Sequence, residues 1–225
     1  MIRFFDAVHP WSLFRMGLSL LVSLLLVGPA EAAEEEESIV ILISLDGVRH
    51  DYLDRADFPA FGRMEAEGLR ADRLVPVFPS STFANHVSLA TGASVETHGI
   101  INNAFIDREK GLYFYGAGEG EGGEPRDWLQ AEPLWVAAER QGLHSAVYFW
   151  VGSESDYRGQ RPSYVRRPFD DDIPDSAKVD QILEWLDLPR AERPRLIMSW
   201  WHGADSEGHT KGPNLCVLSI DPDSP

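Results

Sequence analysis

The sequence predicts an α/β fold built on a mostly parallel central sheet flanked by helices. Short apolar runs rich in β-branched and aromatic residues alternate along the chain with amphipathic segments. Glycine follows the end of several amphipathic segments, as is common after helices. No internal repeat interrupts the alternation. Strands and helices that alternate in this way are typical of parallel sheets covered by helices.

Three apolar runs are predicted to be central strands. Residues 38–47, SIVILISLDG, form a continuous β-branched run, as expected for a strand buried on both faces. Residues 144–152, HSAVYFWVG, and residues 195–201, RLIMSWW, have the same character. Two weaker candidates are an edge or second strand over residues 69–77 and a strand that begins at Tyr113, before a surface loop rich in Gly and Glu.

The amphipathic segments are predicted to be helices. Gly92 follows a segment with Thr82 at its amino end. Because active sites in parallel sheets gather at the carboxyl ends of the strands, polar residues that follow the strands are the candidates for function. The predicted helices cover residues 59–68, 83–92, 132–142 and 177–188.

The first 32 residues have the pattern of a secretory signal peptide. Arg3 and Arg15 precede the apolar run from Met16 to Val27, and small residues lead to a cleavage point after Ala32. The run is shorter than the roughly 20 residues of a bilayer span, and an uncleaved anchor helix is the alternative. We therefore expect an exported, periplasmic or secreted protein, with no stable membrane anchor after cleavage.

Composition limits the classes of ligand, the disulfides and the number of domains that we expect for residues 33–225. The formal net charge is -16 over 225 residues, which argues against nucleic-acid binding but allows small phosphate compounds if metals supply positive charge. Cys216 is the only cysteine, so no disulfide can form within the chain. The length favours one domain.

Asp205 and His209 in the segment DSEGH are candidate metal ligands. Their spacing of four places both side chains on one face of a helical turn. A carboxylate and an imidazole together suit Zn²⁺. The alternative is an ordinary hydrogen-bonded pair on a surface turn.

Asp46 and Thr82 also have two interpretations each. Asp46 followed by glycine at a strand end is either a turn residue or a ligand. Thr82 is either an ordinary helix N-cap or a nucleophile, because a helix N-terminus favours anions and a bound metal would make its hydroxyl an alkoxide.

Three neutral polar residues follow in the same region. His86 lies inside an apolar helix and is interpreted as a packing residue with satisfied hydrogen bonds rather than a ligand. His98 lies in a turn, where local hydrogen bonding is expected. Asn103 is a neutral donor suited to a phosphate oxygen. The Trp200–Trp201 pair is interpreted as strand packing.

Four motifs follow one another along the chain: LDGVR, PSSTFANHVSLATG, THGIINN and DSEGHTKGP. Taken in this order, they resemble the nucleotide pyrophosphatase/phosphodiesterase family of the alkaline phosphatase superfamily. The resemblance runs from about Ser38 to Pro213, nearly all of the chain after the predicted signal peptide. The segment WVGSES at 150–155 is also similar to a Trp-Pro-Gly-Ser-Glu segment of the family, with Val151 in place of proline.

The resemblance implies an alkaline phosphatase-like fold and hydrolysis of phosphodiester or pyrophosphate bonds with two Zn²⁺ ions. It implies that Asp46 binds one zinc together with Thr82, the nucleophile that forms a phosphothreonine. Asn103 would hold a phosphate oxygen of a small diester or nucleotide substrate. Asp205 and His209 would bind the other zinc.

The sequence departs from the family pattern near its end. The family draws further Asp and His ligands from later segments, and the residues after Pro213 contain no histidine. Residues 33–225 are therefore expected to be the N-terminal part of a phosphodiesterase catalytic domain whose C-terminal part is missing. Alternatives are a catalytically incomplete fragment, or another superfamily hydrolase such as a phosphatase, sulfatase or phosphonate hydrolase.

Overall fold

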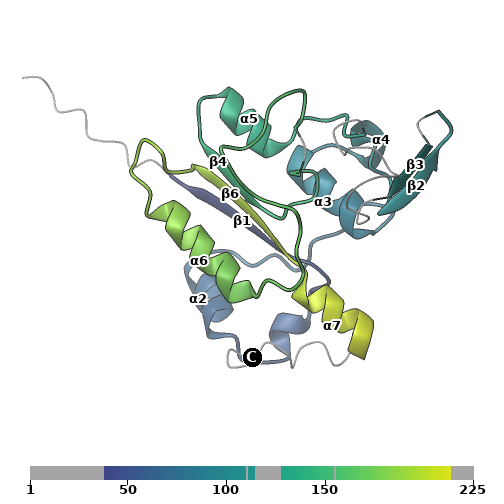
Figure 1. Cartoon of the computed structure of the whole chain (residues 1–225). Coiled ribbons are helices and arrows are strands. Elements are labelled where there is room, and N and C mark those ends of the chain that lie inside the picture. The colour runs from purple at the N-terminus through teal and green to yellow at the C-terminus, as the bar shows by residue number, and fades with distance from the viewer. Residues whose placement is uncertain (1–37, 110, 115–127, 155, 214–225) are drawn as a thin grey trace, which may run out of the picture. The chain divides into compact units, whose positions relative to one another are not determined.

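A four-stranded parallel sheet lies at the centre of the computed structural model, which describes residues 38–109, 111–114, 128–154 and 156–213 (Figure 1). The strand order is β1-β6-β4-β5, and every neighbouring pair is parallel. The predicted α/β class with a mostly parallel sheet is therefore confirmed. The strands are β1 (Val40–Leu45), β4 (Ser145–Tyr148), β5 (Tyr164–Arg166) and β6 (Leu196–Trp201).

Helices flank both faces of this sheet. In Figure 1, α3 and α5 lie on one face and α6 lies on the other. Helix α5 packs on β4, and α6 packs on β6. The described helices are η1 (Tyr52–Asp54), α2 (Pro59–Glu67), α3 (Thr82–Thr91), α4 (Val95–His98), α5 (Leu134–Arg140), α6 (Asp175–Leu186) and α7 (Gly203–Lys211).

The core lies between β4, β6 and the helices packed against them. Every residue of β4 is buried, and large indole rings fill the space beside it. Burial of such rings supplies most of the hydrophobic free energy that holds the layers together. The fully or almost fully buried large apolar side chains are Trp135, Trp150, Ile197, Met198, Val87, Val147 and Val151.

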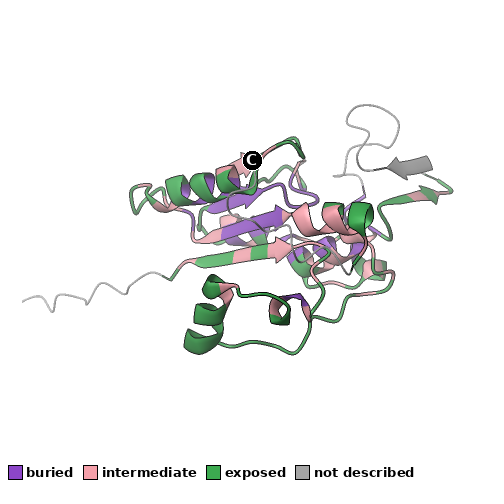
Figure 2. Ribbon diagram, turned by 90° about the horizontal axis from the view of Figure 1, so that it is seen from below, coloured by how far each residue is buried: buried purple, intermediate pink, exposed green. Residues whose placement is uncertain are grey.

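Strand β1 lies at an edge of the sheet, so the prediction that it is buried on both faces was wrong. It pairs with β6 on one side, from Val40 opposite Leu196 to Leu45 opposite Trp201. Val40 is 58% exposed, whereas the neighbouring β6 residues are mostly buried (Figure 2). An apolar run predicts a strand, but burial also requires neighbours on both sides of it.

Two other strand predictions were corrected. Residues 69–77 form no strand; they are almost all exposed, and Arg70 instead pairs with Asp54 and Glu65. The predicted strand near Tyr113 exists as β3 (Gly111–Phe114), but it pairs with β2 (Ala104–Asp107) in an antiparallel ribbon outside the main sheet.

The predicted helices are present, with ends that differ by one to a few residues. Gly92 ends α3 in the left-handed conformation with φ 65°, and its N–H donates to the carbonyl of Ser88 at 2.8 Å. The short elements η1, α4, β2 and β5 were not predicted. The predicted signal peptide and the loop rich in Gly and Glu lie outside the described residues.

Candidate active site

The carboxyl ends of β1 and β6 carry the first candidate residues. Asp46 directly follows β1, and its backbone N–H donates to the carbonyl of Trp201 at 2.9 Å, which extends the pairing of the two strands. Helix α7 begins two residues after β6, at Gly203. The strand register therefore places Asp46 beside the start of the helix that contains Asp205.

Gly47 allows these two segments to approach closely. It has φ +71°, and a Cβ atom added there would lie 2.6 Å from Cα of Asp205. Both the left-handed backbone and the absence of a side chain are thus required for this contact. The approach brings the carboxylates of Asp46 and Asp205 close enough to interact electrostatically.

The pKa of Asp205 is raised, first by burial and then by repulsion from Asp46. Three histidines act in the opposite direction, with His209 the strongest. The Nε2 atom of His209 lies 3.5 Å from Oδ2 of Asp205, one turn away on α7. The predicted helical turn is confirmed, and the simple surface-pair interpretation also describes this geometry because the His209 side chain is 81% exposed.

Thr82 is the first residue of α3 rather than its cap. The N-cap is Ser81, which has an extended backbone with φ −89° and ψ 154°. The interpretation of Thr82 as an N-cap was therefore wrong by one residue. Thr82 lies at the end of the helix where amide groups and the helix dipole favour an anion.

An open cavity of about 1090 Å³ brings the separate segments together. Asp46, Thr82 and Asp205 all line it, although they come from the end of β1, the start of α3 and the first turn of α7. Three of the five candidate residues thus share one cavity at the carboxyl edge of the sheet, whereas Asn103 and His209 are not among its lining residues.

Asn103 is bonded to the beginning of α3. Its Oδ1 accepts the backbone N–H of Phe83 at 2.9 Å, which satisfies one of the amides that a helix N-terminus leaves free. The carbonyl oxygen is therefore occupied by the helix, whereas the side-chain NH₂ group has no hydrogen bond among those described. Asn103 lies next to Thr82 through this bond, as the sequence predicted.

His86 connects the first turn of α3 with β1. Its Nδ1 lies 2.7 Å from the carbonyl oxygen of Thr82, and its Nε2 lies 2.8 Å from Oγ of Ser44. Burial lowers the pKa of His86, while the Thr82 carbonyl and the carboxylates of Asp46 and Asp205 act against this shift. His86 is thus a buried residue with both ring nitrogens bonded, as predicted.

His98 also follows its predicted local role. It is fully buried, its Nδ1 accepts the N–H of Ile100, and its Nε2 lies 2.8 Å from Oγ of Ser88. Burial lowers its pKa below the usual value. The Trp200 ring is packed as predicted, but its Nε1 also donates to Oδ2 of Asp46 at 3.3 Å.

The oxygen and nitrogen donors of Asp46, Asp205 and His209 are chemically suited to Zn²⁺. A cation between the two carboxylates would remove the repulsion that raises the pKa of Asp205. The three side chains form a loose set, however. Among the described residues, three such ligands lie within 4.8 Å of one another at the exposed run Asp170–Asp172.

Sequence reasoning did not identify Ser44, Gly47 or Trp200 as parts of this site. Ser44 could have been noticed as a polar residue in an otherwise apolar strand, two positions before Asp46. Gly47 was noted only as the glycine that follows Asp46, where Asp46 was the candidate turn residue. The bond from Trp200 to Asp46 depends on strand pairing between segments 154 residues apart, which no local pattern reveals.

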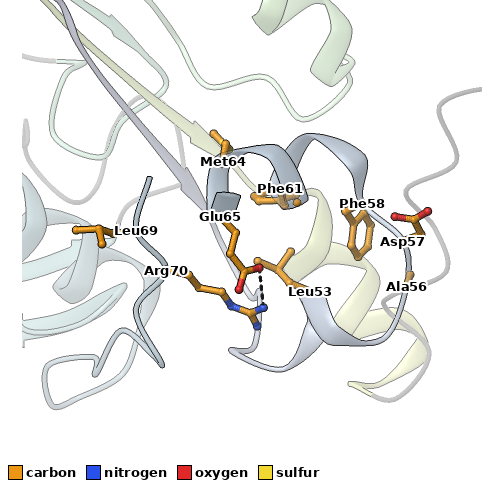
Figure 3. A pocket seen from close by; sticks show the side chains of 10 residues that line it. Leu53, Ala56, Asp57, Phe58, Phe61, Met64, Glu65, Leu69 and Arg70 are labelled. Atoms are coloured by element: carbon orange, nitrogen blue, oxygen red, sulfur yellow. Dashed lines mark hydrogen bonds and ion pairs between the residues drawn. The ribbon is translucent and has the colours of Figure 1, made fainter. Parts of the chain in front are cut away.

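A second, smaller cavity of about 410 Å³ lies between η1 and α2 (Figure 3). Leu53, Phe58, Phe61 and Met64 supply an apolar lining, and Arg70 pairs with Glu65 at its border. None of the candidate residues lines this cavity, so it is separate from the site at the strand ends.

A parallel sheet flanked by helices, with an open cavity at the carboxyl ends of its strands, is typical of α/β proteins that bind their ligands at the strand ends. Within this class, the chain belongs to the type I phosphodiesterase / nucleotide pyrophosphatase family, whose model matches residues 40–223. The family resemblance of the four motifs is thereby confirmed.

Characterised and uncharacterised proteins from distant organisms share this similarity. The chain is 41% identical to an uncharacterised pyrophosphatase/phosphodiesterase of Schizosaccharomyces pombe over 82% of its own length and 38% of that protein. It is 38% identical to a venom phosphodiesterase of Crotalus durissus collilineatus over 79% of the chain and 21% of the relative. The chain thus spans well under half the length of these relatives.

Solved structures confirm the alkaline phosphatase-like architecture. Murine ectonucleotide pyrophosphatase/phosphodiesterase 5 matches with a TM-score of 0.73 and 26% identity, over 80% of this chain and 47% of that one. An inactive threonine-to-alanine variant of the murine protein in complex with AMP matches with a TM-score of 0.72 and 27% identity, over 84% of this chain and 47% of that one.

The described residues contain no helix that is both long enough and apolar enough to cross a membrane.

Proposed function

We propose that this protein hydrolyses phosphodiester or pyrophosphate bonds of nucleotides, with Thr82 as the nucleophile and two Zn²⁺ ions as cofactors. Family membership supports the reaction class. The observation that carries the assignment of residues is the shared cavity lined by Asp46, Thr82 and Asp205.

The side chains divide into two groups of ligands in this proposal. Asp46 and Thr82 would hold one ion, and Asp205 and His209 would hold the other, with further ligands completing each shell. Bound zinc supplies positive charge that offsets the phosphate charge and lowers the pKa of coordinated hydroxyl groups and water.

The reaction proceeds by two displacements at phosphorus. Thr82 Oγ forms a bond to phosphorus while the bond from phosphorus to the leaving oxygen breaks, and the threonine proton ends on the departing group. Water then attacks phosphorus of the covalent threonine intermediate, which still carries the second ester group of the substrate, and this step releases a phosphate monoester and restores the hydroxyl. A covalent intermediate of this kind divides one difficult step into two easier ones.

Asn103 and the beginning of α3 stabilise charge on the phosphoryl oxygens. Since Oδ1 of Asn103 already accepts from Phe83, the amide orientation leaves the NH₂ group as the donor for substrate. A neutral donor adds no titrating group to the site. The N-terminus of α3 contributes further favourable dipoles beside Thr82.

Nucleotides are the proposed substrate class because the solved variant of the murine relative binds AMP. A net charge of -16 disfavours long nucleic acids, whose phosphates would be repelled. We further propose that the protein is exported, as the signal-peptide pattern and the similarity to venom phosphodiesterases indicate.

The test is hydrolysis of a nitrophenyl ester of thymidine monophosphate by the full-length protein supplied with Zn²⁺. Thr82→Ala is expected to abolish release of nitrophenolate, because it removes the hydroxyl that acts as the proposed nucleophile. Loss of a nucleophile removes a factor on the order of 10³ or more. Thr82→Ser keeps the hydroxyl and should retain a measurable rate.

Binding of Zn²⁺ measured by calorimetry serves as the companion experiment. Asp46→Asn and Asp205→Asn should each weaken binding, while Asp171→Asn, in the exposed acidic run, should leave it unchanged. Turnover that survives Thr82→Ala, or zinc affinity equal in all three variants, would contradict the assignment.

A further inference from the structure

We propose that His86 is a positioning residue that ties the first turn of α3 to the end of β1 and thereby fixes Thr82 relative to Asp46. The consequence for catalysis rests on the proposed function. The structural part of the inference stands on the hydrogen bonds of His86 alone.

The two partners of His86 belong to the two segments that carry the candidate residues. Its Nδ1 bonds to the carbonyl of Thr82 itself, at 2.7 Å. Its Nε2 bonds to Oγ of Ser44, at 2.8 Å, and Ser44 lies two residues before Asp46 in the chain. The imidazole therefore spans the gap between helix and strand beside the proposed nucleophile.

The hydrogen-bond chemistry selects one tautomer. A backbone carbonyl can only accept, so Nδ1 of His86 carries the proton and donates to Thr82. Nε2 then lacks a proton and accepts from the hydroxyl of Ser44. The neutral ring satisfies both partners at once, whereas the other tautomer would present Nε2–H to Ser44 and leave the Thr82 carbonyl without this donor.

Two indole rings hold the imidazole plane in place. His86 makes edge-on contacts with Trp150 at 5.4 Å and with Trp200 at 5.7 Å between ring centroids. The Trp150 Nε1 group also donates to the backbone carbonyl of His86 at 2.9 Å. With the ring held by these contacts, movement of Thr82 away from β1 must break a bond rather than follow a rotating side chain.

His98, the last residue of α4, provides an internal comparison because its serine partner lies on the same helix as His86. It is also buried and bonded to a serine, since its Nε2 lies 2.8 Å from Oγ of Ser88. Its Nδ1 accepts from the N–H of Ile100, so it must have the opposite tautomer. The hydrogen bonds from His98 to Ser88 and Ile100 do not involve Thr82, so the Ser88–His98 pair is the matched control for the Ser44–His86 pair.

The first experiment determines both tautomers by long-range ¹H–¹⁵N correlation spectra of the chain labelled at histidine. We expect His86 to show a protonated Nδ1 and His98 a protonated Nε2. A His86 ring with the proton on Nε2, or rapid exchange between tautomers, would overturn the inference. This measurement requires neither zinc nor catalytic activity.

The second experiment measures hydrogen exchange of two amides in the first turn of α3. Phe83 N–H is bonded to Asn103, and Asn85 N–H is bonded to the carbonyl of Ser81 at 3.1 Å. Ser44→Ala should raise exchange of both amides by about five- to tenfold, the factor expected for loss of one hydrogen bond. Ser88→Ala should leave these two amides unchanged.

His86→Asn and His86→Phe separate positioning from simple packing. Asparagine places an amide donor near the position of Nδ1 and should preserve part of the protection, whereas phenylalanine fills the space without any bond and should lose it. Ser44→Ala should add nothing to His86→Phe, because both remove the same connection. Equal exchange in wild type and His86→Phe would show that His86 only fills space.

The catalytic consequence is measured in the full-length protein. Ser44→Ala should lower kcat by roughly 10- to 100-fold through misplacement of Thr82 while KM changes by no more than about threefold. An unchanged kcat would refute the positioning role. If wild type itself lacks phosphodiesterase activity, the proposed function fails, and the tautomer and exchange experiments still decide the structural part.

Discussion

The region around β4 and β6 differs sharply from the region formed by β1, η1 and α2. Strands β1 and β6 are both apolar and run side by side in parallel register. Yet Ile197 and Met198 of β6 are fully buried, while Val40 and Ile43 of β1 are 58% and 43% exposed. Helix α2 has no buried residue at all. Strands β1 and β6 thus have similar sequences but different environments, because β6 has a neighbouring strand on both sides and β1 has one on a single side.

The candidate site lies on the boundary between these regions. Asp46 follows the exposed strand, whereas Thr82 begins a helix packed into the core. The contacts that cross the boundary set their relative position: the pairing of β1 with β6, the bonds of His86 and the close approach at Gly47. The geometry of the site is thus set by specific contacts rather than by general burial.

The largest expected difference concerns stability. Trp150 is fully buried and Met64 of α2 is 64% exposed. Trp150→Ala should lower the free energy of unfolding by about 3–5 kcal/mol because it leaves a large cavity and a buried carbonyl without its donor. Met64→Ala should change it by less than about 0.5 kcal/mol. Urea denaturation followed by circular dichroism measures both, and similar losses would remove the distinction between the regions.

The sequence predicted the parallel sheet and its main helices because these depend on local patterns. Strands β1, β4 and β6 are apolar runs of the right length, and α3 ends at a glycine in the left-handed conformation. Local patterns could not predict that β1 lies at an edge of the sheet, or that residues 69–77 form no strand. Both depend on which segments lie next to them, and no local pattern encodes that.

The candidate residues were predicted in part for the same reason. Asp46, Thr82 and Asp205 were identified from the sequence because each follows a predicted strand or begins a predicted helix. In the structure, these three residues line one cavity. Their chemical roles remain predictions. Ser44 and Trp200 were missed because their bonds to His86 and Asp46 join segments that are distant in sequence.

The second prediction tests a contact across the boundary. Gly47→Ala should cost about 2 kcal/mol or more, because the left-handed backbone alone costs about 1–2 kcal/mol and the new Cβ would lie 2.6 Å from Cα of Asp205. Displacement of Asp205 should also weaken Zn²⁺ binding. Calorimetric unfolding and zinc titration measure the two effects.

Gly92→Ala is the matched control for Gly47→Ala. Gly92 has a similar φ of +65°, but a Cβ added there meets nothing within 4 Å. It should cost only the backbone penalty of about 1 kcal/mol and leave zinc binding unchanged. Equal effects of both substitutions on zinc binding would show that the approach of Gly47 to Asp205 does not matter.

The third and smallest effect concerns a carboxylate in each region. Glu139, at the end of α5, accepts hydrogen bonds from the backbone and hydroxyl groups of Ser145 and Ser163. Burial by itself would raise the pKa of Glu139, but these hydrogen bonds outweigh it and the pKa is lowered. Asp51 of the β1–α2 region also has a lowered pKa, mainly through its hydrogen bond from Arg49, but it forms surface ion pairs.

Because the folded-state pKa of Glu139 lies below the unfolded value, its ionised form stabilises the fold above the unfolded pKa, near 4.5. This contribution disappears as the pH falls through the folded pKa. Glu139→Gln should therefore be less stable than wild type at pH 7, and the difference should shrink below about pH 4. Asp51→Asn should show little difference at any pH in 0.15 M salt, since exposed ion pairs contribute little. Thermal unfolding from pH 3 to 7 measures both variants. A gap for Glu139→Gln that stays constant with pH would mean that shape rather than charge stabilises α5 against β4. A large, pH-dependent gap for Asp51→Asn would instead mean that the exposed region relies on electrostatic bonds as much as the core does.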